Sequence, residues 1–247
     1  AFSSLGGNLS AISINPASSS VFELSRLGFS LNGDRKDIES NFSNSSSSVN
    51  SNYFNFQGGI VYVFKNYGEG KFRKFSFGIN NQNTNDYNFD QLIKGKSSFS
   101  VDRFFLNNSI GYNVNDVSVG SNETINGVYR WLGQNYGYSS QQAFLGFQSY
   151  LLDYDNQNNS FYSIAKYNNG LDINNFYYSQ GSKNKSSINL AAQYGENFYF
   201  GINFNIYELY SKKSFRHLEN NFDNDSAITL IDFRNELLTR GKGFSVQ

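Results

Sequence analysis

The stretch Phe198–Tyr207, FYFGINFNIY, decides the fold. Its apolar side chains are Phe198, Phe200, Ile202, Phe204 and Ile206, and they alternate with Tyr199, Gly201, Asn203, Asn205 and Tyr207. Successive side chains of a β-strand point to opposite faces of the sheet. The period of two therefore predicts a strand with one apolar face and one small or polar face.

The same alternation occurs in the residues just before this stretch. Ser187–Tyr194 repeats it, and only Gly195–Asn197 separates the two segments, which predicts a β-hairpin with a tight turn. Phe54–Phe64 and Lys74–Asn80 show a similar pattern on either side of a glycine-containing turn at Tyr67–Gly70. Two long hairpins are expected from these segments.

Four less regular stretches are further strand candidates: Val21–Asn32, Phe104–Val114, Asn174–Gln180 and Ile228–Leu238. Roughly seven or eight strands result, and several exceed the ~9 to 11 residues of a tilted membrane strand. Strands of a soluble antiparallel sandwich are about 5 to 6 residues long and carry Lys, Glu or Thr on the wet face. The pattern favours a transmembrane β-barrel, with the soluble sandwich as the alternative.

The connections between these strands differ in length. Short turns are expected at Tyr67–Gly70 and Gly195–Asn197, and long polar loops at Gly33–Asn52, Asn81–Ser98 and Asp153–Gly170. Outer-membrane barrels have short turns on the periplasmic side and longer loops outside the cell. The serine-rich run Ser43–Ser48 is accordingly interpreted as part of a solvated loop.

Composition excludes several other classes of protein. The 20 Lys and Arg balance 20 Asp and Glu, so no basic field favours nucleic acid as a partner. The longest apolar run, Ile60–Phe64, is far shorter than the ~20 residues of a membrane-spanning helix. A closed barrel is the remaining way to cross a bilayer. The first residue is Ala1 rather than Met, so an upstream segment is expected, either a removed signal peptide or a truncated part.

Two segments have helical rather than β periodicity. One is Glu123–Gly133, with Ser121 or Asn122 as the expected N-cap, and the other is Ser139–Leu152. In one interpretation the two helices pack on each other as an ordered loop. In the other, their apolar faces also line a groove for a hydrophobic ligand, formed by Trp131, Phe144, Phe147 and Leu151.

Residue patterns typical of enzymes and metal sites do not occur in the sequence. There is no GxSxG, HExxH, P-loop or GxGxxG motif, and the single histidine, His217, is expected on the surface. The spaced acids Asp153, Asp155, Asp223 and Asp225 lie in Asn-rich stretches and are interpreted as solvated loop residues. Neither catalytic residues, nor a metal site, nor a cofactor is predicted.

Three segments together resemble one family of membrane proteins. LGGNLSAISINPASSSVF at residues 5–22 contains Asn15, Pro16 and Ala17, and Pro16 is the only proline. GYSSQQAFLGFQSYLL at residues 137–152 and FRNELLTRGKGF at residues 233–244 complete the pattern. With these segments the chain resembles, from end to end, the FadL-type outer-membrane transporters of long-chain fatty acids and other hydrophobic compounds.

The resemblance implies an all-β protein, an antiparallel transmembrane β-barrel in the outer membrane of a Gram-negative cell. Residues 1–20 would form an N-terminal hatch and residues 21–247 barrel strands, with a helical loop insertion at 115–170 outside the cell. Family barrels have roughly fourteen strands, so the chain would cover about the N-terminal half. The family passively takes up hydrophobic cargo, which enters the barrel and leaves sideways through a gap in its wall. Fatty acids, outer-membrane lipid and detergent are the implied partners.

Two other functions remain open at this point. One is an accessory subunit of a larger outer-membrane secretion or assembly complex, in which other outer-membrane subunits would be partners. The other is a soluble Asn/Ser-rich surface adhesin. The hatch has alternatives too: Asn15 could anchor it to the inner wall through side-chain hydrogen bonds, with Pro16 and Ala17 shaping the segment, or the three residues could simply form a turn before the first strand.

Overall fold

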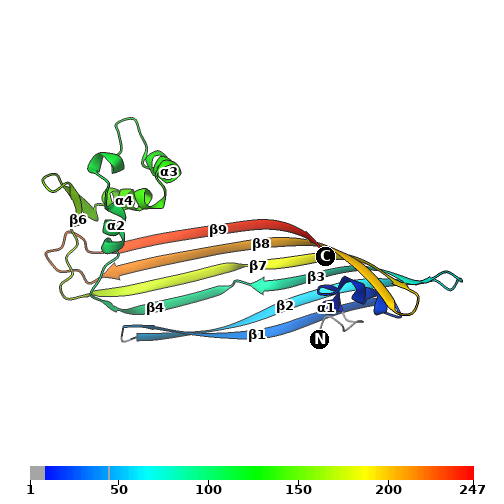
Figure 1. Cartoon of the computed structure of the whole chain (residues 1–247). Helices are drawn as coiled ribbons and strands as arrows, with labels where there is room; N and C mark the ends of the chain where they lie inside the picture. Colours follow the sequence, from blue (N-terminus) through cyan, green and yellow to red (C-terminus); the bar gives the residue numbers. More distant parts are fainter. Residues whose placement is uncertain (1–8, 44) are drawn as a thin grey trace.

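The computed structural model describes residues 9–43 and 45–247 and contains one large antiparallel sheet with a group of short helices at one end (Figure 1). Its strands are β1 (Arg26–Phe42), β2 (Ser45–Lys65), β3 (Phe72–Asp86), β4 (Phe89–Ser97), β7 (Leu171–Tyr194), β8 (Phe198–Asn220) and β9 (Ile231–Val246). The expected all-β, antiparallel architecture is confirmed. The order is β1-β2-β3-β7-β8-β9, so the sheet is open, and β1 and β9 are its edges.

Strands β3 and β4 are two parts of one interrupted strand. They pair with consecutive parts of β7, β3 from Phe72 to Asp86 and β4 from Phe89 to Ser97. At the interruption the Tyr87 N–H donates to the Gly181 carbonyl (2.9 Å), and the Gly181 N–H donates to Asn88 Oδ1 (3.1 Å). Gly181 has a φ of +149° and lies against the backbone of β8, where a side chain would collide.

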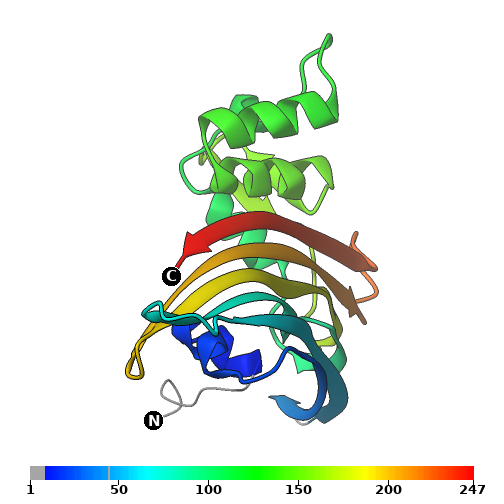
Figure 2. The ribbon, with the colours of Figure 1, turned by 90° about the vertical axis from the view of Figure 1, so that its right-hand side faces the viewer.

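The sheet is curved, and its two faces differ. Figure 2, which looks along the strands, shows the N-terminal segment on the concave side. This segment comprises α1 (Leu9–Ile12), the 3-10 helix η2 (Pro16–Val21) and Phe22. It covers polar side chains on the concave face of the sheet, so that Asn203 and Asn205 of β8 are 0% and 1% exposed. The predicted alternation of β8 is confirmed, with its polar face turned inward.

The convex face carries a wide apolar surface, which we call the apolar band. Its exposed members are Leu27, Phe29, Leu31, Phe54, Phe56, Tyr62, Phe64, Phe75, Ile79, Ile188, Leu190, Phe198, Phe200, Ile202, Phe204, Ile206, Phe244 and Val246. They lie on six neighbouring strands, toward the end of the sheet where the short turns lie. Monomeric soluble proteins rarely expose apolar patches larger than a few hundred Å², and larger patches are typical of surfaces that contact a membrane or another protein.

Beyond the band the same face becomes charged. Between β8 and β9, Lys242 pairs with Glu208 (3.2 Å) and Lys212 with Glu236 (2.9 Å). Closer to the helices, Arg216 lies 2.9 Å from Asp232. Exposed ion pairs contribute little to stability, but they mark a sharp boundary between apolar and hydrated parts of one surface.

Several predicted boundaries are wrong. Gly33–Asn52 and Asn81–Ser98, expected as loops, lie largely within strands, and Ser45 in the serine run already pairs with Phe42. Backbone pairing does not need an apolar side chain where both faces are hydrated. Asn174–Gln180 and Ser187–Tyr194 belong to one 24-residue strand, β7.

The candidate strand Phe104–Val114 is also wrong. It overlaps most of the helix α2 (Asp102–Ser109), in which Phe105 and Ser109 are buried at helical spacing, and the first residue of the 3-10 helix η3 (Val114–Val117). The first strand begins at Arg26 rather than Val21, since Pro16–Val21 is helical.

Both predicted helices are confirmed, as α3 (Ile125–Asn135) and α4 (Tyr138–Gln148). Thr124, rather than Ser121 or Asn122, caps α3 by accepting the Gly127 N–H at 3.1 Å. With α2, η3 and the small hairpin of β5 (Leu152–Asp155) and β6 (Ser160–Ser163), they form the helical region, residues 99–170. No helix among the described residues is long and apolar enough to span a membrane.

Candidate functional site

The N-terminal segment is held on the concave face by side chains of the sheet strands, several of which donate hydrogen bonds to its carbonyl groups. Asn203 Nδ2 donates to the Ile12 carbonyl at 2.6 Å, and Asn189 Nδ2 to the Pro16 carbonyl at 2.8 Å. At the far side of η2, the hydroxyl groups of Ser19 and Ser76 lie 2.7 Å apart. Polar bonds therefore fix the segment together with a small apolar cluster, in which Ile12 and Phe22 pack against Val61 of β2.

The tripeptide Asn15-Pro16-Ala17 starts η2. Asn15 Oδ1 accepts the Ala17 N–H at 3.1 Å, and Pro16 occupies the first helical position, where its missing N–H costs nothing. The tripeptide also touches the wall. Gly201 lies so close that a Cβ atom there would collide with the backbone of Pro16 and Ala17. The tripeptide therefore both caps η2 and packs closely against the backbone of β8.

An ion-pair clamp follows the segment. Glu23 lies 2.6 Å from the buried Nζ of Lys74 and 2.9 Å from Nζ of Lys65. Hydrogen bonds from Lys74 first, and then from Lys65, lower the pKa of the Glu23 carboxyl from 4.5 to about 2. The clamp fixes the point where the chain enters β1.

An aromatic pocket of about 440 Å³ lies further along the concave face, toward the helical region. Aromatic residues from four strands and the β3–β4 interruption line it: Tyr53, Tyr87, Phe89, Tyr177, Tyr178 and Phe215. The rings of Tyr177 and Phe215 form a cross-strand pair at 4.8 Å. Three charged residues also line it, the cationic Lys36 and Lys213 and the acidic Asp86.

The chemistry of this pocket suits an apolar molecule with a polar or anionic end. Aromatic walls provide contact area at little entropic cost, and a few placed polar groups set orientation. Lys36 Nζ lies 5.8 Å from the centre of the Phe89 ring, a cation–π distance. Nothing in the arrangement resembles a nucleophile with an adjacent base.

Beside the pocket, β2 and β4 form a seam. Among the described residues no backbone hydrogen bond joins these two strands. Side chains connect them instead: Ser47 Oγ donates to the Leu92 carbonyl (2.7 Å), and Gln91 Nε2 donates to the Ser47 carbonyl (3.4 Å). Gln91 Nε2 also donates to Ser40 Oγ of β1 (2.9 Å). Such a seam separates at lower cost than a paired ladder.

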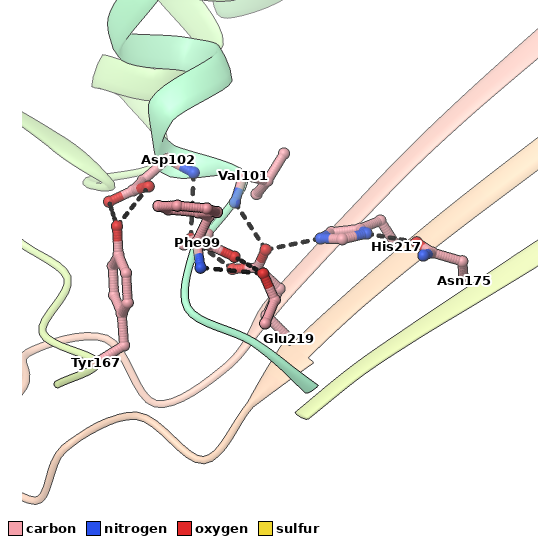
Figure 3. A network of polar contacts seen from close by, with 9 residues as sticks. Phe99, Val101, Asp102, Tyr167, Asn175, His217 and Glu219 are labelled. Carbon is pink, nitrogen blue, oxygen red and sulfur yellow. Dashed lines mark hydrogen bonds and ion pairs between the residues drawn. The ribbon is translucent and has the colours of Figure 1, made fainter. Parts of the chain in front are cut away.

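A buried polar joint connects the helical region to the strand ends (Figure 3). Glu219, fully buried at the end of β8, accepts hydrogen bonds from Ser100 Oγ (2.5 Å) and the Val101 N–H (2.7 Å). His217 Nε2 lies 2.7 Å from Glu219 Oε1, and its Nδ1 lies 2.5 Å from Asn175 Oδ1. The expectation that His217 is a surface residue is wrong, because its side chain is only 12% exposed.

A second carboxylate extends the joint into α2. Asp102, 2% exposed, accepts hydrogen bonds from Ser163 Oγ (2.6 Å) and the Tyr167 hydroxyl (3.1 Å). Burial is the largest cause that raises the pKa of the Tyr167 phenol. These bonds join the two chain connections of the helical region to each other, and Glu219 fixes the first of them to β8. The sequence held a signal for the inward position of His217. It lies fourteen residues after Asn203 on the same strand, and an even spacing places two residues on the same face of a sheet.

The four residues predicted to bind a hydrophobic ligand do not share one cavity. Phe144 and Leu151 are buried in the core of the helical region. Phe147 packs against Phe161 with ring centres 5.7 Å apart. Trp131 is 52% exposed and lies against Tyr136 at the outer side of α3. The helices pack on each other as the first interpretation proposed, and the aromatic pocket of the sheet was missed.

The loop acids lie in local hydrogen bonds. Asp153 accepts from the Tyr162 hydroxyl (2.9 Å), Asp155 binds Asn158, and Asp225 pairs with Lys166 (2.7 Å). Within residues 9–43 and 45–247, no cluster of three or more His, Cys, Asp or Glu side chains could hold a metal ion.

Comparisons with known proteins return no relative. No family model matches the chain, and no match was found among curated proteins or solved structures.

Proposed function

We propose that the chain forms part of the wall of an outer-membrane β-barrel that passes hydrophobic compounds such as long-chain fatty acids. The observation that carries this proposal is the inverted sheet: phenylalanines cover its exposed convex face, and asparagines lie buried on its concave face. Such polarity is opposite to that of a soluble sheet and typical of a barrel between lipid and a polar lumen. The proposed location is the outer membrane.

The height of the apolar band supports the proposal. On β8 it runs from Phe198 to Ile206, eight intervals of about 3.4 Å, or about 27 Å along the strand. A strand tilt of about 40° reduces the height to about 21 Å, close to the roughly 25 Å of an outer-membrane band. The charged rows that follow would then face the hydrated exterior.

Barrel closure needs more strands than the sheet contains. The edges β1 and β9 present unpaired backbone groups, which lipid cannot satisfy. Further strands, from the same polypeptide or from another subunit, would pair with them. In the closed wall the N-terminal segment would lie in the lumen as the hatch.

The cargo route would follow the concave face. The aromatic pocket would receive a molecule arriving from the helical region, which would lie outside the cell. The adjacent seam between β2 and β4 lies level with the charged rows, outside the apolar band, so it would open toward the hydrated exterior rather than into the membrane. An accessory subunit would use the same wall without passing cargo, whereas a soluble adhesin is disfavoured by the exposed band.

Liposome flotation with two variants of one strand tests the membrane assignment. Ile202→Arg places a cation within the band and should cost ~2 to 4 kcal/mol near the bilayer centre, so refolded protein should no longer float with vesicles. Tyr210→Arg changes the same face of β8 within the charged rows and should float like the parent. Equal flotation of both variants would contradict a lipid-facing band.

Uptake separates a channel from an accessory subunit. Cells that produce the protein should import a fluorescent fatty acid faster than cells that produce the Ile202→Arg variant. If flotation is normal but uptake does not depend on the protein, the accessory role replaces the channel.

A further inference from the structure

Two lysines lie on the concave face between the aromatic pocket and the N-terminal segment. Lys183 and Lys185 of β7 pair with Leu209 and Tyr207 of β8, whereas Tyr177 of the pocket and Asn189 of the segment contacts lie on either side of them. Both Nζ atoms are 5.7 Å from the centre of the Tyr207 ring. Two cations thus share one aromatic neighbour.

Lys185 is buried without an anion. It is 7% exposed, and within the described part of the chain no carboxylate lies within 4.0 Å of either Lys183 or Lys185. Residues 1–8 contain no acidic side chain. Lys74 has the same exposed fraction, but its ammonium group is paired with a carboxylate, because Glu23 lies 2.6 Å from it. Burying an ammonium group is costly unless an opposite charge compensates it.

Besides its side-chain contact with Tyr207, Lys185 makes a hydrogen bond to the N-terminal segment. Its Nζ donates to the Ser13 carbonyl at 3.3 Å, a long bond to an uncharged oxygen. Ser13 lies between Ile12 and Pro16, whose carbonyl groups the wall also binds. An arriving anion would compete with a weak acceptor and would win, because charge-assisted hydrogen bonds are about twice as strong as neutral ones.

The remaining charges on this face also favour an anion. Asp34 accepts from Asn55 Nδ2 at 2.8 Å, and Asp86 accepts from the Asn88 N–H at 2.7 Å, so both acids are engaged in local bonds. Lys36 and Lys213 of the pocket add two more cations. Tyr207 is the titratable group that faces the pair from β8.

We propose that Lys183 and Lys185 form an anion-binding site for a carboxylate or phosphate group, and that its occupation releases the N-terminal segment from the wall. The anion takes the Lys185 ammonium group away from the Ser13 carbonyl. The segment then loses one of its fixed points. This site goes beyond the proposed transport function, because it can be measured on detergent-solubilised protein whether or not cargo moves.

The test uses the absence of cysteine from the chain. Ser18 is 2% exposed, and its hydroxyl has no hydrogen-bond partner among the described residues, so Ser18→Cys places a buried thiol without breaking a bond. The rate of maleimide labelling then reports release of the segment. The probes are inorganic phosphate, octanoate and uncharged octanol, at constant ionic strength in chloride.

Phosphate and octanoate should accelerate labelling at least about fivefold, the lower end of typical couplings between two sites, and octanol should not. An effect of octanoate alone would identify the source as the head of an amphiphile, and an effect of phosphate alone a free anion. Lys185→Met should abolish the dependence on anion concentration, and Lys185→Arg should restore it. Lys212→Gln, on the outer face, should respond like the parent.

Two results would overturn the inference. A labelling rate that changes with neither phosphate nor octanoate would show that the site and the segment are not coupled. Acceleration that persists in Lys185→Met shows that the anion acts elsewhere.

Discussion

The bond between Asn203 and the Ile12 carbonyl predicts how firmly the N-terminal segment is held. Asn203→Ala removes this 2.6 Å bond and leaves the carbonyl of the buried residue Ile12 without its donor. An orphaned buried polar group costs about 1 to 3 kcal/mol. At 1.4 kcal/mol for each factor of ten, detachment of the segment should become about 5-fold to 150-fold more frequent.

Asn205→Ala is the matched control. Asn205 lies two residues further along the same strand and face, is equally buried, and bonds to Ser187 (2.7 Å) and Ser245 (3.3 Å) rather than to the segment. Both variants should lower the midpoint of urea unfolding by similar amounts. Native-state hydrogen exchange should separate them, because the amide of Asn15, which donates to Ala11 within the segment, should exchange faster only in Asn203→Ala. Equal exchange in both variants would refute the assignment of Asn203 as an anchor.

Four further expectations concern other parts of the structure. Gly201→Ala should push the segment off β8 and increase its proteolysis, whereas Gly243→Ala, whose Cβ would meet its nearest neighbour at 3.7 Å, should not. Glu219→Ala should cost about 2 to 4 kcal/mol in urea unfolding, because two donors lose their acceptor in a buried joint; unchanged stability would show that the joint is dispensable. The Glu23 clamp stabilises the folded state above pH 4.5 and should be lost as the pH falls toward about 2. Glu23→Gln removes this carboxylate, so release of the segment should be more frequent than in the parent at neutral pH and should lose its dependence on pH between 4.5 and 2. Phe215→Asn should weaken binding of a fluorescent fatty acid at least tenfold, since a buried aromatic side chain contributes about 1.5 to 3 kcal/mol; equal affinity would move the ligand away from the pocket.

Local pattern was enough to predict the central hairpin. The alternation from Phe198 to Ile206 fixes which side chains share a face, and the three residues after Tyr194 leave room only for a tight turn. Helical spacing likewise identifies α3, although its cap is Thr124 rather than Ser121 or Asn122. These features depend on residues that are near one another in sequence.

The pocket and the joint could not be found in this way. Tyr53, Tyr177 and Phe215 meet only because β2, β7 and β8 have one particular register across the sheet. The polar halves of β1 and β2 were mistaken for a loop because hydration of both faces removes the apolar signal while leaving the backbone pairing intact. Glu219 could not be predicted as buried for a related reason. A carboxylate in a polar stretch of sequence is expected on the surface, and its hydrogen-bond donors, Ser100 and Val101, lie far away in the sequence.

Strand β8 carries, on one face, both the anchor of the N-terminal segment at Asn203 and the joint of the helical region at Glu219. Sixteen residues at about 3.3 Å each separate them by about 53 Å along the strand, and unbroken ladders to β7 and β9 stiffen most of that length. The strand therefore works mechanically as a strut between two attachments. A force on the helical region would be transmitted along β8 to the polar bonds at Asn203, whereas the seam between β2 and β4, which lacks backbone hydrogen bonds, would separate more easily.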